Sequence, residues 1–278
     1  MESQKALCSK FDLKGRMIVA NEGINGTFEG KSAAIDKYCR QLVKDKRFAN
    51  VHFKLSEGSG KAFGKLSIKV RDEIVSGHLG EADVDPSKVT GKYITAQQLH
   101  SWFEEEREFY IVDMRNDFEQ EVGMFEGSVK SGMHLFRDLP KTAEKISKLK
   151  NKTIVTVCTG GVRCEKASGF LIENGFKNVY QLQGGIHAYV ERYPNEHFRG
   201  ALYVFDQRVV MSFGSPQDKG RQIIGKCVRC GSVSENYVNC KNPGCNRHFI
   251  ACATCEADGI LCPMGCYRPK ANRNSVAV

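Results

Sequence analysis

One loop of the sequence carries the residue types of a reactive thiolate: Cys158-Thr159-Gly160-Gly161-Val162-Arg163. It follows the apolar run Thr153 to Val157 and precedes a helical pattern, so Cys158 is expected at a sheet edge where ligands bind. Two glycines allow successive backbone N–H groups to point inward, and the helix N-terminus and Arg163 add positive potential. The sequence therefore predicts that the pKa of Cys158 is lower than that of a free thiol.

The spacing of this loop distinguishes two chemistries, and a second thiol lies close by. Cysteine phosphatases have Cys-x5-Arg, in which a ring of amides encloses a phosphate, whereas Cys-x4-Arg here encloses something nearer a single sulfur or oxygen atom. A phosphatase is the weaker interpretation. Cys164 lies in the first turn of the predicted helix, either as a packing residue or as a resolving thiol that attacks an oxidised or persulfidated Cys158.

Eight more cysteines form four close pairs near the C-terminus: Cys227 and Cys230, Cys240 and Cys245, Cys252 and Cys255, and Cys262 and Cys266. Short loops of this kind deliver thiolates to tetrahedral zinc, and eight ligands match two ions. Disulfides and iron–sulfur ligation are the alternatives, and His248 is a possible substitute ligand. Because the segment has few apolar residues for a core, metal loss should unfold it.

The reactive loop needs a rigid sheet beneath it, and the central third of the chain predicts one. Apolar strands alternate there with helical patterns, which indicates a parallel sheet covered by helices on both faces. The expected strands are 109–113, 153–157 and 178–180. The expected helices are 96–106, 142–150, 164–174 and one that opens at Gly184-Gly185.

The two flanks have different patterns. Residues 1–90 predict a small helix-on-sheet α+β domain, and residues 201–278 predict a cysteine-rich domain beyond the strand-like run 202–205. In the first domain we expect strands at 16–20, 27–29, 51–55 and 65–70, a tight turn at 21–26, a helix at 33–43, and a linker at 80–91.

The net charge of +9 lies on the flanks: residues 1–90 carry +4, residues 91–200 carry 0 and residues 201–278 carry +5. Such surfaces suit a polyanion such as RNA, although a solvated basic face without a partner explains them equally well. Lys65, Lys69 and Arg71 alternate along one strand face and are the candidate RNA contacts. No apolar stretch is long enough for a membrane span and no signal peptide begins the chain, which predicts a cytoplasmic protein.

Several motifs together resemble a known family. The Cys158 loop with Asp113-Met114-Arg115 upstream and Gly184-Gly185 downstream resembles the rhodanese superfamily. Glu165-Lys166-Ala167-Ser168 after the loop, Glu22-Gly23-Ile24-Asn25-Gly26-Thr27 in the first domain and the cysteine-rich tail narrow the resemblance to rhodanese-domain tRNA uridine hydroxylases. The implied fold is α/β, with a central rhodanese-like sheet at 91–200 and an N-terminal ferredoxin- or acylphosphatase-like domain at 1–90. Family members carry an extra strand before Leu13 to Ala20, so the first domain here is expected to be incomplete or differently paired.

The resemblance implies oxygen-dependent synthesis of 5-hydroxyuridine at the wobble position of tRNA. Molecular oxygen is then a co-substrate, tRNA is the partner, and the cysteine that matches Cys158 is essential, with Arg163 and Cys164 as further candidate catalytic residues. Asp113 and Arg115 are expected to form a buried pair that braces the loop. As a mechanism we hypothesise that the Cys158 thiolate adds to C6 of the ring, which makes C5 nucleophilic.

Two other functions remain open. A sulfurtransferase would carry a persulfide on Cys158 and would use the same site. A non-catalytic module would bind RNA or protein through the basic flanks, and Cys158 would then be dispensable. The sequence indicates no protein partner and no electron source.

Overall fold

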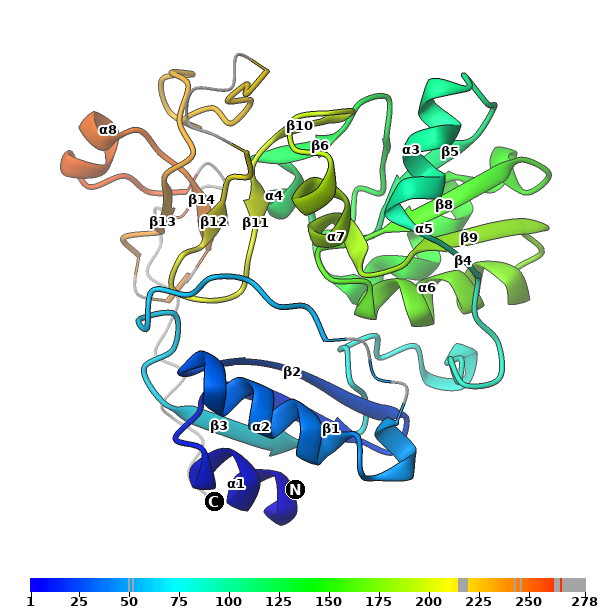
Figure 1. Cartoon of the computed structure of the whole chain (residues 1–278). Helices are drawn as coiled ribbons and strands as arrows, with labels where there is room; N and C mark the ends of the chain where they lie inside the picture. Colours follow the sequence, from blue (N-terminus) through cyan, green and yellow to red (C-terminus); the bar gives the residue numbers. More distant parts are fainter. Residues whose placement is uncertain are drawn as a thin grey trace, which may run out of the picture.

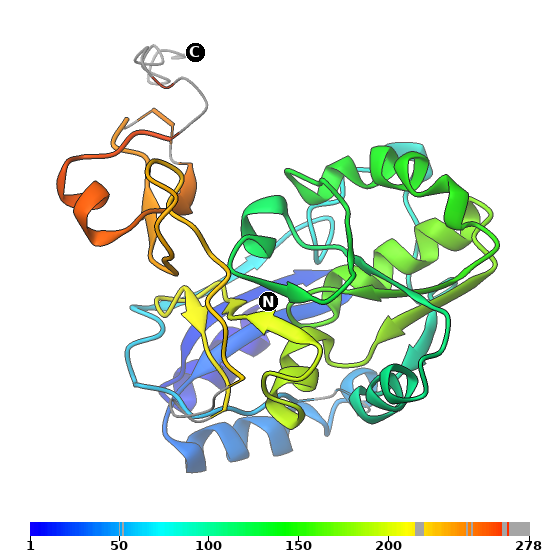
Figure 2. The same ribbon diagram turned by 90° about the horizontal axis from the view of Figure 1, so that it is seen from above.

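The computed structural model describes residues 1–49, 51, 53–214, 220–242, 244–245, 247–262 and 266. Figure 1 shows three parts: an N-terminal domain, a central α/β domain, and a cysteine-rich segment beside them. In Figure 2 the cysteine-rich segment, drawn in orange, projects away from the other two. Among the described residues, no helix has both the length and the apolar character needed to cross a bilayer.

The central domain is built on a five-stranded parallel sheet with the order β4-β9-β8-β5-β7. Its strands are β4 (Lys92–Ile94), β5 (Tyr110–Asp113), β7 (Val129–Lys130), β8 (Thr153–Val157) and β9 (Asn178–Leu182). Its main helices are α3 (Ala96–Glu104), α5 (Leu139–Lys145), α6 (Val162–Glu173) and α7 (Gly185–Arg192). The predicted parallel sheet is confirmed. Cys158 directly follows the last residue of its middle strand, β8.

Both faces of the sheet are covered, as the buried strand residues require. On β8, Ile154 packs with residues of α5 and α6, whereas Val155 and Val157 pack with residues of α3 and α7. Successive side chains of a strand point to opposite faces, so each face builds its own hydrophobic core. The sheet edge that carries Cys158 is therefore held from both sides.

The N-terminal domain has the order α1 (Glu2–Lys10), β1 (Lys14–Ala20), β2 (Gly23–Glu29), α2 (Ser32–Leu42) and β3 (Leu66–Val70). Its three-stranded sheet has β1 in the middle, antiparallel to β2 and parallel to β3. The chain before β1 forms a helix. The predicted turn at 21–26 is shorter than expected, because Gly23 already pairs with Ala20 and only Asn21 and Glu22 connect the strands.

Three predictions for the elements are wrong. The described residues of 51–55 form no strand, because Val51 and Phe53 pack on the N-terminal core while Lys54 reaches the central domain. Residues 80–91 are no free linker, because Val84 is buried in the central core. The helix expected at 142–150 begins at Leu139, next to Pro140, and gives way to a 3-10 turn, η4 (Ser147–Leu149).

Lys166 on α6 joins the N-terminal and central domains. Its side chain is 1% exposed, and its Nζ lies 3.2 Å from Glu22, 3.0 Å from Glu73 and 2.9 Å from Asp83. Glu22 also accepts a hydrogen bond from the Ile74 backbone N–H at 2.7 Å. A buried lysine needs such partners, so the Glu22 turn and the helix after the Cys158 loop stabilise one another.

The remaining elements are short and are distributed over all three parts of the chain. They are α4 (Asp117–Gln120), β6 (Gly123–Phe125), β10 (Phe198–Gly200), β11 (Leu202–Tyr203), β12 (Val210–Met211), β13 (Tyr237–Asn239), β14 (His248–Ile250), α8 (Ala253–Ala257) and the 3-10 turns η1 (Lys46–Phe48), η2 (Gly80–Ala82) and η3 (Phe136–Asp138). Tyr203 on β11 and Ile250 on β14 are buried with Phe118 of α4 against them. The Tyr237 hydroxyl donates to the Phe118 carbonyl oxygen, so the cysteine-rich segment packs directly on α4.

Candidate active site

Cys158 lies at the C-terminal end of β8 and is only 1% exposed. Its Sγ accepts a hydrogen bond from the Gly161 backbone N–H at 3.1 Å. Gly161 adopts φ +94°, which a residue with a side chain rarely does, and α6 begins at the next residue. The loop thus continues directly into the helix, whose N-terminal amides are directed at the sulfur.

The β9–α7 turn holds the outer side of the loop. The backbone N–H groups of Ile186 and His187 donate to the carbonyl oxygens of Cys158 and Thr159 at 2.9 and 3.1 Å. A Cβ at Gly185 would lie 2.5 Å from the Cys158 carbonyl oxygen, so only glycine fits there. Because these carbonyl oxygens are bonded outward, the amides of the loop are free to face the thiolate.

Arg163 is held by Glu119 of α4, a residue that the sequence interpretation did not assign a role. Its guanidinium donates to both carboxylate oxygens of Glu119, at 2.5 and 2.8 Å, and to the Thr159 hydroxyl at 3.2 Å. Burial acts to lower the pKa of Arg163, but Glu119 outweighs it and the net pKa is raised. Arg163 therefore stays charged beside the loop, as a bidentate partner of a buried carboxylate.

The Asp113–Arg115 pair expected below the loop is present. Both side chains are fully buried and their closest atoms lie 2.6 Å apart. The Arg115 guanidinium also donates to the carbonyl oxygens of Glu119 and Gly123. The pair thereby fixes the backbone of α4 and, through Glu119, the position of Arg163.

The pKa values of the two thiols move in opposite directions. Burial acts to raise the pKa of Cys158, but a hydrogen bond from Cys164, the charge of Arg163 and backbone amides of α6 together lower it. Burial and the neighbouring thiolate raise the pKa of Cys164 well above its ordinary value. The surroundings therefore favour the thiolate form at Cys158 and the neutral thiol at Cys164.

Two further side chains reach this site from the flanks, and neither was predicted. Lys54 Nζ donates to the Gly160 carbonyl oxygen. Phe205, whose side chain is half exposed, lies with its ring 5.6 Å from the Arg163 guanidinium carbon. Neither lies in a recognisable motif, so no local signal in the sequence marks them.

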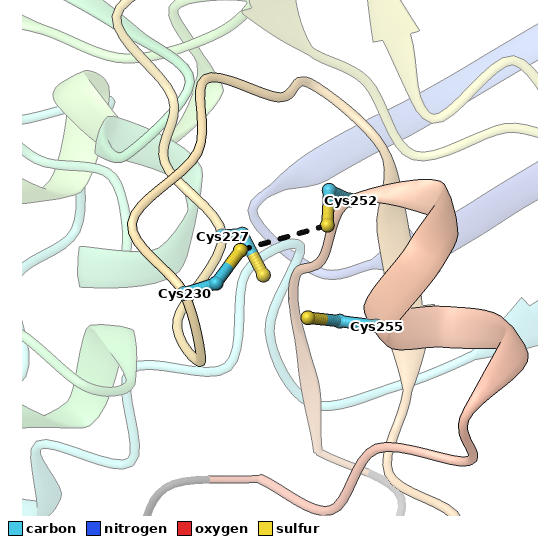
Figure 3. A group of neighbouring side chains, drawn as sticks. All are labelled: Cys227, Cys230, Cys252 and Cys255. Carbon is cyan, nitrogen blue, oxygen red and sulfur yellow. Dashed lines mark hydrogen bonds between the residues drawn. The ribbon is translucent and has the colours of Figure 1, made fainter.

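The eight cysteines of the C-terminal segment form two groups of four. One contains Cys227, Cys230, Cys252 and Cys255, and the other contains Cys240, Cys245, Cys262 and Cys266. Figure 3 shows the four sulfurs of the first group converging from one loop, which carries Cys227 and Cys230, and from the N-terminal end of α8, which carries Cys252 and Cys255. Each group combines alternate pairs along the chain, so the two groups interleave.

The geometry of both groups fits a tetrahedral metal ion. All four sulfurs of each group lie within 4.8 Å of one another, with 3.6 Å between Cys230 and Cys252 and 3.7 Å between Cys245 and Cys262. Four thiolates around zinc at a Zn–S distance of about 2.3 Å are separated by roughly 3.8 Å. All twelve cysteines are free, and His248 lies outside both groups, bonded to the Tyr203 hydroxyl at 3.0 Å.

Three family models match the chain in succession. They are the UPF0176 acylphosphatase like domain over residues 1–74, the rhodanese-like domain over 95–192 and the rhodanase C-terminal over 199–267. Proteins named tRNA uridine(34) hydroxylase match nearly the whole chain. The protein from Cytophaga hutchinsonii is 39% identical over 254 residues, 91% of this chain and 80% of that protein. The protein from Staphylococcus haemolyticus is 40% identical over 270 residues, 96% of this chain and 83% of that protein.

The chain belongs to the tRNA uridine(34) hydroxylase family. The predicted family and the predicted fold class are thereby confirmed. Among solved structures, a rhodanese-related protein from Thermoplasma volcanium is 24% identical and covers 36% of this chain and 92% of its own, with a TM-score of 0.31. The relatives of about 40% identity, rather than this likeness, show the family.

The structure brings most of the predicted site residues together. Cys158 to Arg163 and Cys164 form one unit, although Val162 is the first residue of α6 rather than part of the loop. Lys65, Lys69 and Arg71 are exposed along and just beyond the ends of β3, outside that unit. Their role as RNA contacts stays a prediction.

Proposed function

We propose that this protein hydroxylates C5 of uridine 34 in tRNA, with Cys158 as the nucleophile. The observation that carries the proposal is a buried thiol in an amide-lined loop that lowers its pKa, in a chain that shares about 40% of its residues with proteins of that name. A thiolate held by backbone amides is suited to covalent catalysis on an electron-poor ring. The tRNA substrate and the reduced thiols both agree with a cytoplasmic location.

The first chemical step follows from the chemistry of uracil. The Cys158 sulfur bonds to C6, and the electron pair of the C5–C6 double bond moves toward the C4 carbonyl oxygen as an enolate. C5 then reacts with molecular oxygen, and one oxygen atom stays on the ring. The other leaves as water after an external donor supplies two electrons. Loss of the C5 proton and departure of the thiolate restore the ring.

Two residues of the central domain have proposed roles around the nucleophile. Cys164 donates its thiol hydrogen to the Cys158 sulfur and helps to hold it ionised. Arg163 maintains the positive potential of the loop and joins it to α4 through Glu119. The resolving role of Cys164 would require it to be a thiolate, which its raised pKa disfavours.

We also propose that zinc fills both cysteine groups. Four thiolates in a tetrahedral arrangement are the ligand set of structural zinc sites, which leave no open position for a substrate. Zinc there would hold the cysteine-rich domain together and take no part in the reaction. The proposed division of the chain is 1–90, 91–200 and 201–278, with the zinc ions in the last part.

The test is nucleoside mass spectrometry of tRNA from cells that lack this gene, complemented with wild type, Cys158→Ser or Cys39→Ser. Cys39 is a partly exposed thiol of α2 and provides the matched control. We expect 5-hydroxyuridine to vanish in the deletion and to return, in the presence of oxygen, with wild type and Cys39→Ser but not with Cys158→Ser.

Two results would contradict the proposal. Loss of thiolated uridines with unchanged hydroxylated ones would indicate a sulfurtransferase that carries a persulfide on Cys158. Full complementation by Cys158→Ser would indicate a binding module that does not use the thiol. The host must have no second route to 5-hydroxyuridine, which its deletion strain shows directly.

A further inference from the structure

Lys54 belongs to the N-terminal domain but lies over the active-site loop of the central domain. Its Nζ donates to the Gly160 carbonyl oxygen. A Cβ added at Gly160 would lie 3.4 Å from Lys54 Nζ, and one added at Gly184 would lie 3.5 Å from Lys54 Cε. The lysine side chain therefore lies in contact range of the backbone on both sides of the loop mouth, at Gly160 and at Gly184.

The positive charge of Lys54 has no carboxylate partner among the described residues. Both arginines of the site already form ion pairs with carboxylates: Arg115 with Asp113 at 2.6 Å, and Arg163 with Glu119 at 2.5 Å. Glu165 also acts on Lys54, but it forms no ion pair with it and accepts hydrogen bonds from Tyr93 and Gln181. Of the negative groups that act on Lys54, the Cys158 sulfur acts most strongly.

The electrostatics of the lysine agree with this geometry. Burial lowers the pKa of Lys54, and the negative charges of Cys158, Cys164 and Glu165 oppose that lowering. Of the two thiols, Cys158 is the one held as thiolate. Opposite charges in a partly desolvated site stabilise one another far more than they do in water.

We propose that Lys54 is the counter-ion of the Cys158 thiolate, so that docking of the N-terminal domain onto the loop controls formation of the nucleophile. The reaction that the Cys158 thiolate then carries out is the one given by the proposed function, on which this inference rests. Lys54 acts through Cys158 and is a positioning residue. The domain interface around Lys166, Glu22 and Glu73 keeps it in place.

Several charged groups influence Cys158, and the test must separate Lys54 from them. Arg163 and Cys164 face the sulfur from α6, and Asp113 and Glu119 act from β5 and α4 through the arginines. Lys54 is the contribution from outside the central domain. Its replacement leaves all the others unchanged.

The experiment measures the rate of Cys158 alkylation by iodoacetamide against pH, in the full-length zinc-loaded protein, with the modified peptide followed by mass spectrometry. We expect Lys54→Met to raise the apparent pKa of Cys158 by about 1, which makes alkylation about tenfold slower below both midpoints. Lys54→Arg should retain the wild-type midpoint. Lys37→Met, which removes an exposed charge from α2, is the matched control and should change nothing.

The acid limb of the pH–rate profile of tRNA hydroxylation should shift with the pKa of Cys158. Lys54→Met should lose turnover below the raised midpoint of Cys158 and regain it as the pH increases. Alkylation needs no tRNA, so a chain that never hydroxylates tRNA would still report the Lys54 effect. Thermal melting of each variant confirms that it is folded. An unchanged midpoint in folded Lys54→Met, or an equal shift in Lys54→Arg, would overturn the inference.

Discussion

Cys158 and the C-terminal cysteine groups are two environments in which one chain keeps thiolates. In the central domain a single sulfur accepts amide hydrogen bonds at the end of a rigid strand, with a donating thiol and cations around it. In the cysteine-rich domain four sulfurs lie within 4.8 Å of one another. There the proposed zinc ions would supply the balancing positive charge.

The cores of the two regions explain why the environments differ. Aliphatic and aromatic side chains fill both faces of the central sheet, which positions the loop without any ion. In the cysteine-rich core, four of the eight buried members are themselves cysteines: Cys227, Cys240, Cys255 and Cys262. A thiolate stays reactive where the fold is built without it, and becomes structural where the fold depends on it.

The largest effect should come from removing one ligand of the C-terminal groups. Cys230 is exposed, so Cys230→Ser leaves no cavity and any loss of structure reflects the missing ligand. We expect the zinc content to fall below two ions per chain and the C-terminal domain to become sensitive to protease, while the central domain stays folded. Elemental analysis and limited proteolysis measure the two quantities.

Cys39→Ser is the control for this experiment and should keep both zinc and protease resistance. A Cys230→Ser protein with a metal-free yet protease-resistant tail would mean that ordinary packing holds the domain. The contrast between the two cysteine environments would then be lost.

An intermediate effect is expected when the buried anion of the central site is neutralised. Glu119→Gln keeps the shape but leaves the Arg163 charge unpaired, which should lower the free energy of unfolding by about 3 kcal/mol at pH 7. The alkylation midpoint of Cys158 should fall further, the opposite of the Lys54→Met result, because a negative neighbour has been removed. Urea unfolding and iodoacetamide kinetics provide the measurements.

The pH dependence of this contribution has a definite sign. Burial acts to raise the pKa of Glu119, but Arg163 outweighs it and the pKa in the folded protein is lowered. The pair therefore stabilises the fold fully above the unfolded value of about 4.3, and the stabilisation is lost as pH falls through the lowered pKa. Glu119→Gln should lack this acid transition. The same acid transition in wild type and variant would show that Glu119 contributes nothing of this kind.

The smallest effect should come from exposed lysines of the N-terminal domain, which lie outside both cysteine environments. Reversal of Lys65 or Lys69 to Glu should weaken tRNA binding uniformly across tRNAs and reduce the slope of log affinity against log salt by about 1 for each lost phosphate contact. Lys141→Glu, on an exposed lysine of the neutral central domain, is the matched control. Filter binding between roughly 50 and 200 mM salt measures both quantities. Equal tRNA affinities for wild type and the reversed variants would mean that RNA binds another surface, most simply the basic C-terminal segment.

Sequence patterns correctly predicted those elements whose structure depends mainly on neighbouring residues in the chain. The apolar run before Cys158 and the glycines after it are sufficient to predict the strand, the loop and the helix, since each depends on neighbouring residues. The paired cysteines predict metal ligation for the same reason. Their partition into two interleaved groups depends on the tertiary fold and does not follow from the spacings.

Two of the three wrong predictions concern segments that are shaped by another domain. Val51 and Phe53 alternate as in a strand. The next residue, Lys54, bonds to the Gly160 carbonyl oxygen of the central domain, and the described residues of this segment form no sheet pairing. Residues 80–91 contain turn formers, yet Val84 is buried against the central core. Glu119 gave no signal of its partner because Arg163 is distant in sequence and meets it only across the fold.

The interleaving of the cysteine pairs also has a consequence for biosynthesis. The first group cannot be completed until the chain has passed Cys240 and Cys245 of the second group, which lie between its two halves. Early thiols must therefore wait, reduced and unpaired, until Cys255 and then Cys266 have left the ribosome. Closing the first group also encircles half of the second and shortens the search for its remaining ligands. If zinc fills both groups as proposed, the supply of free zinc during translation should influence how much of this protein matures without aggregating.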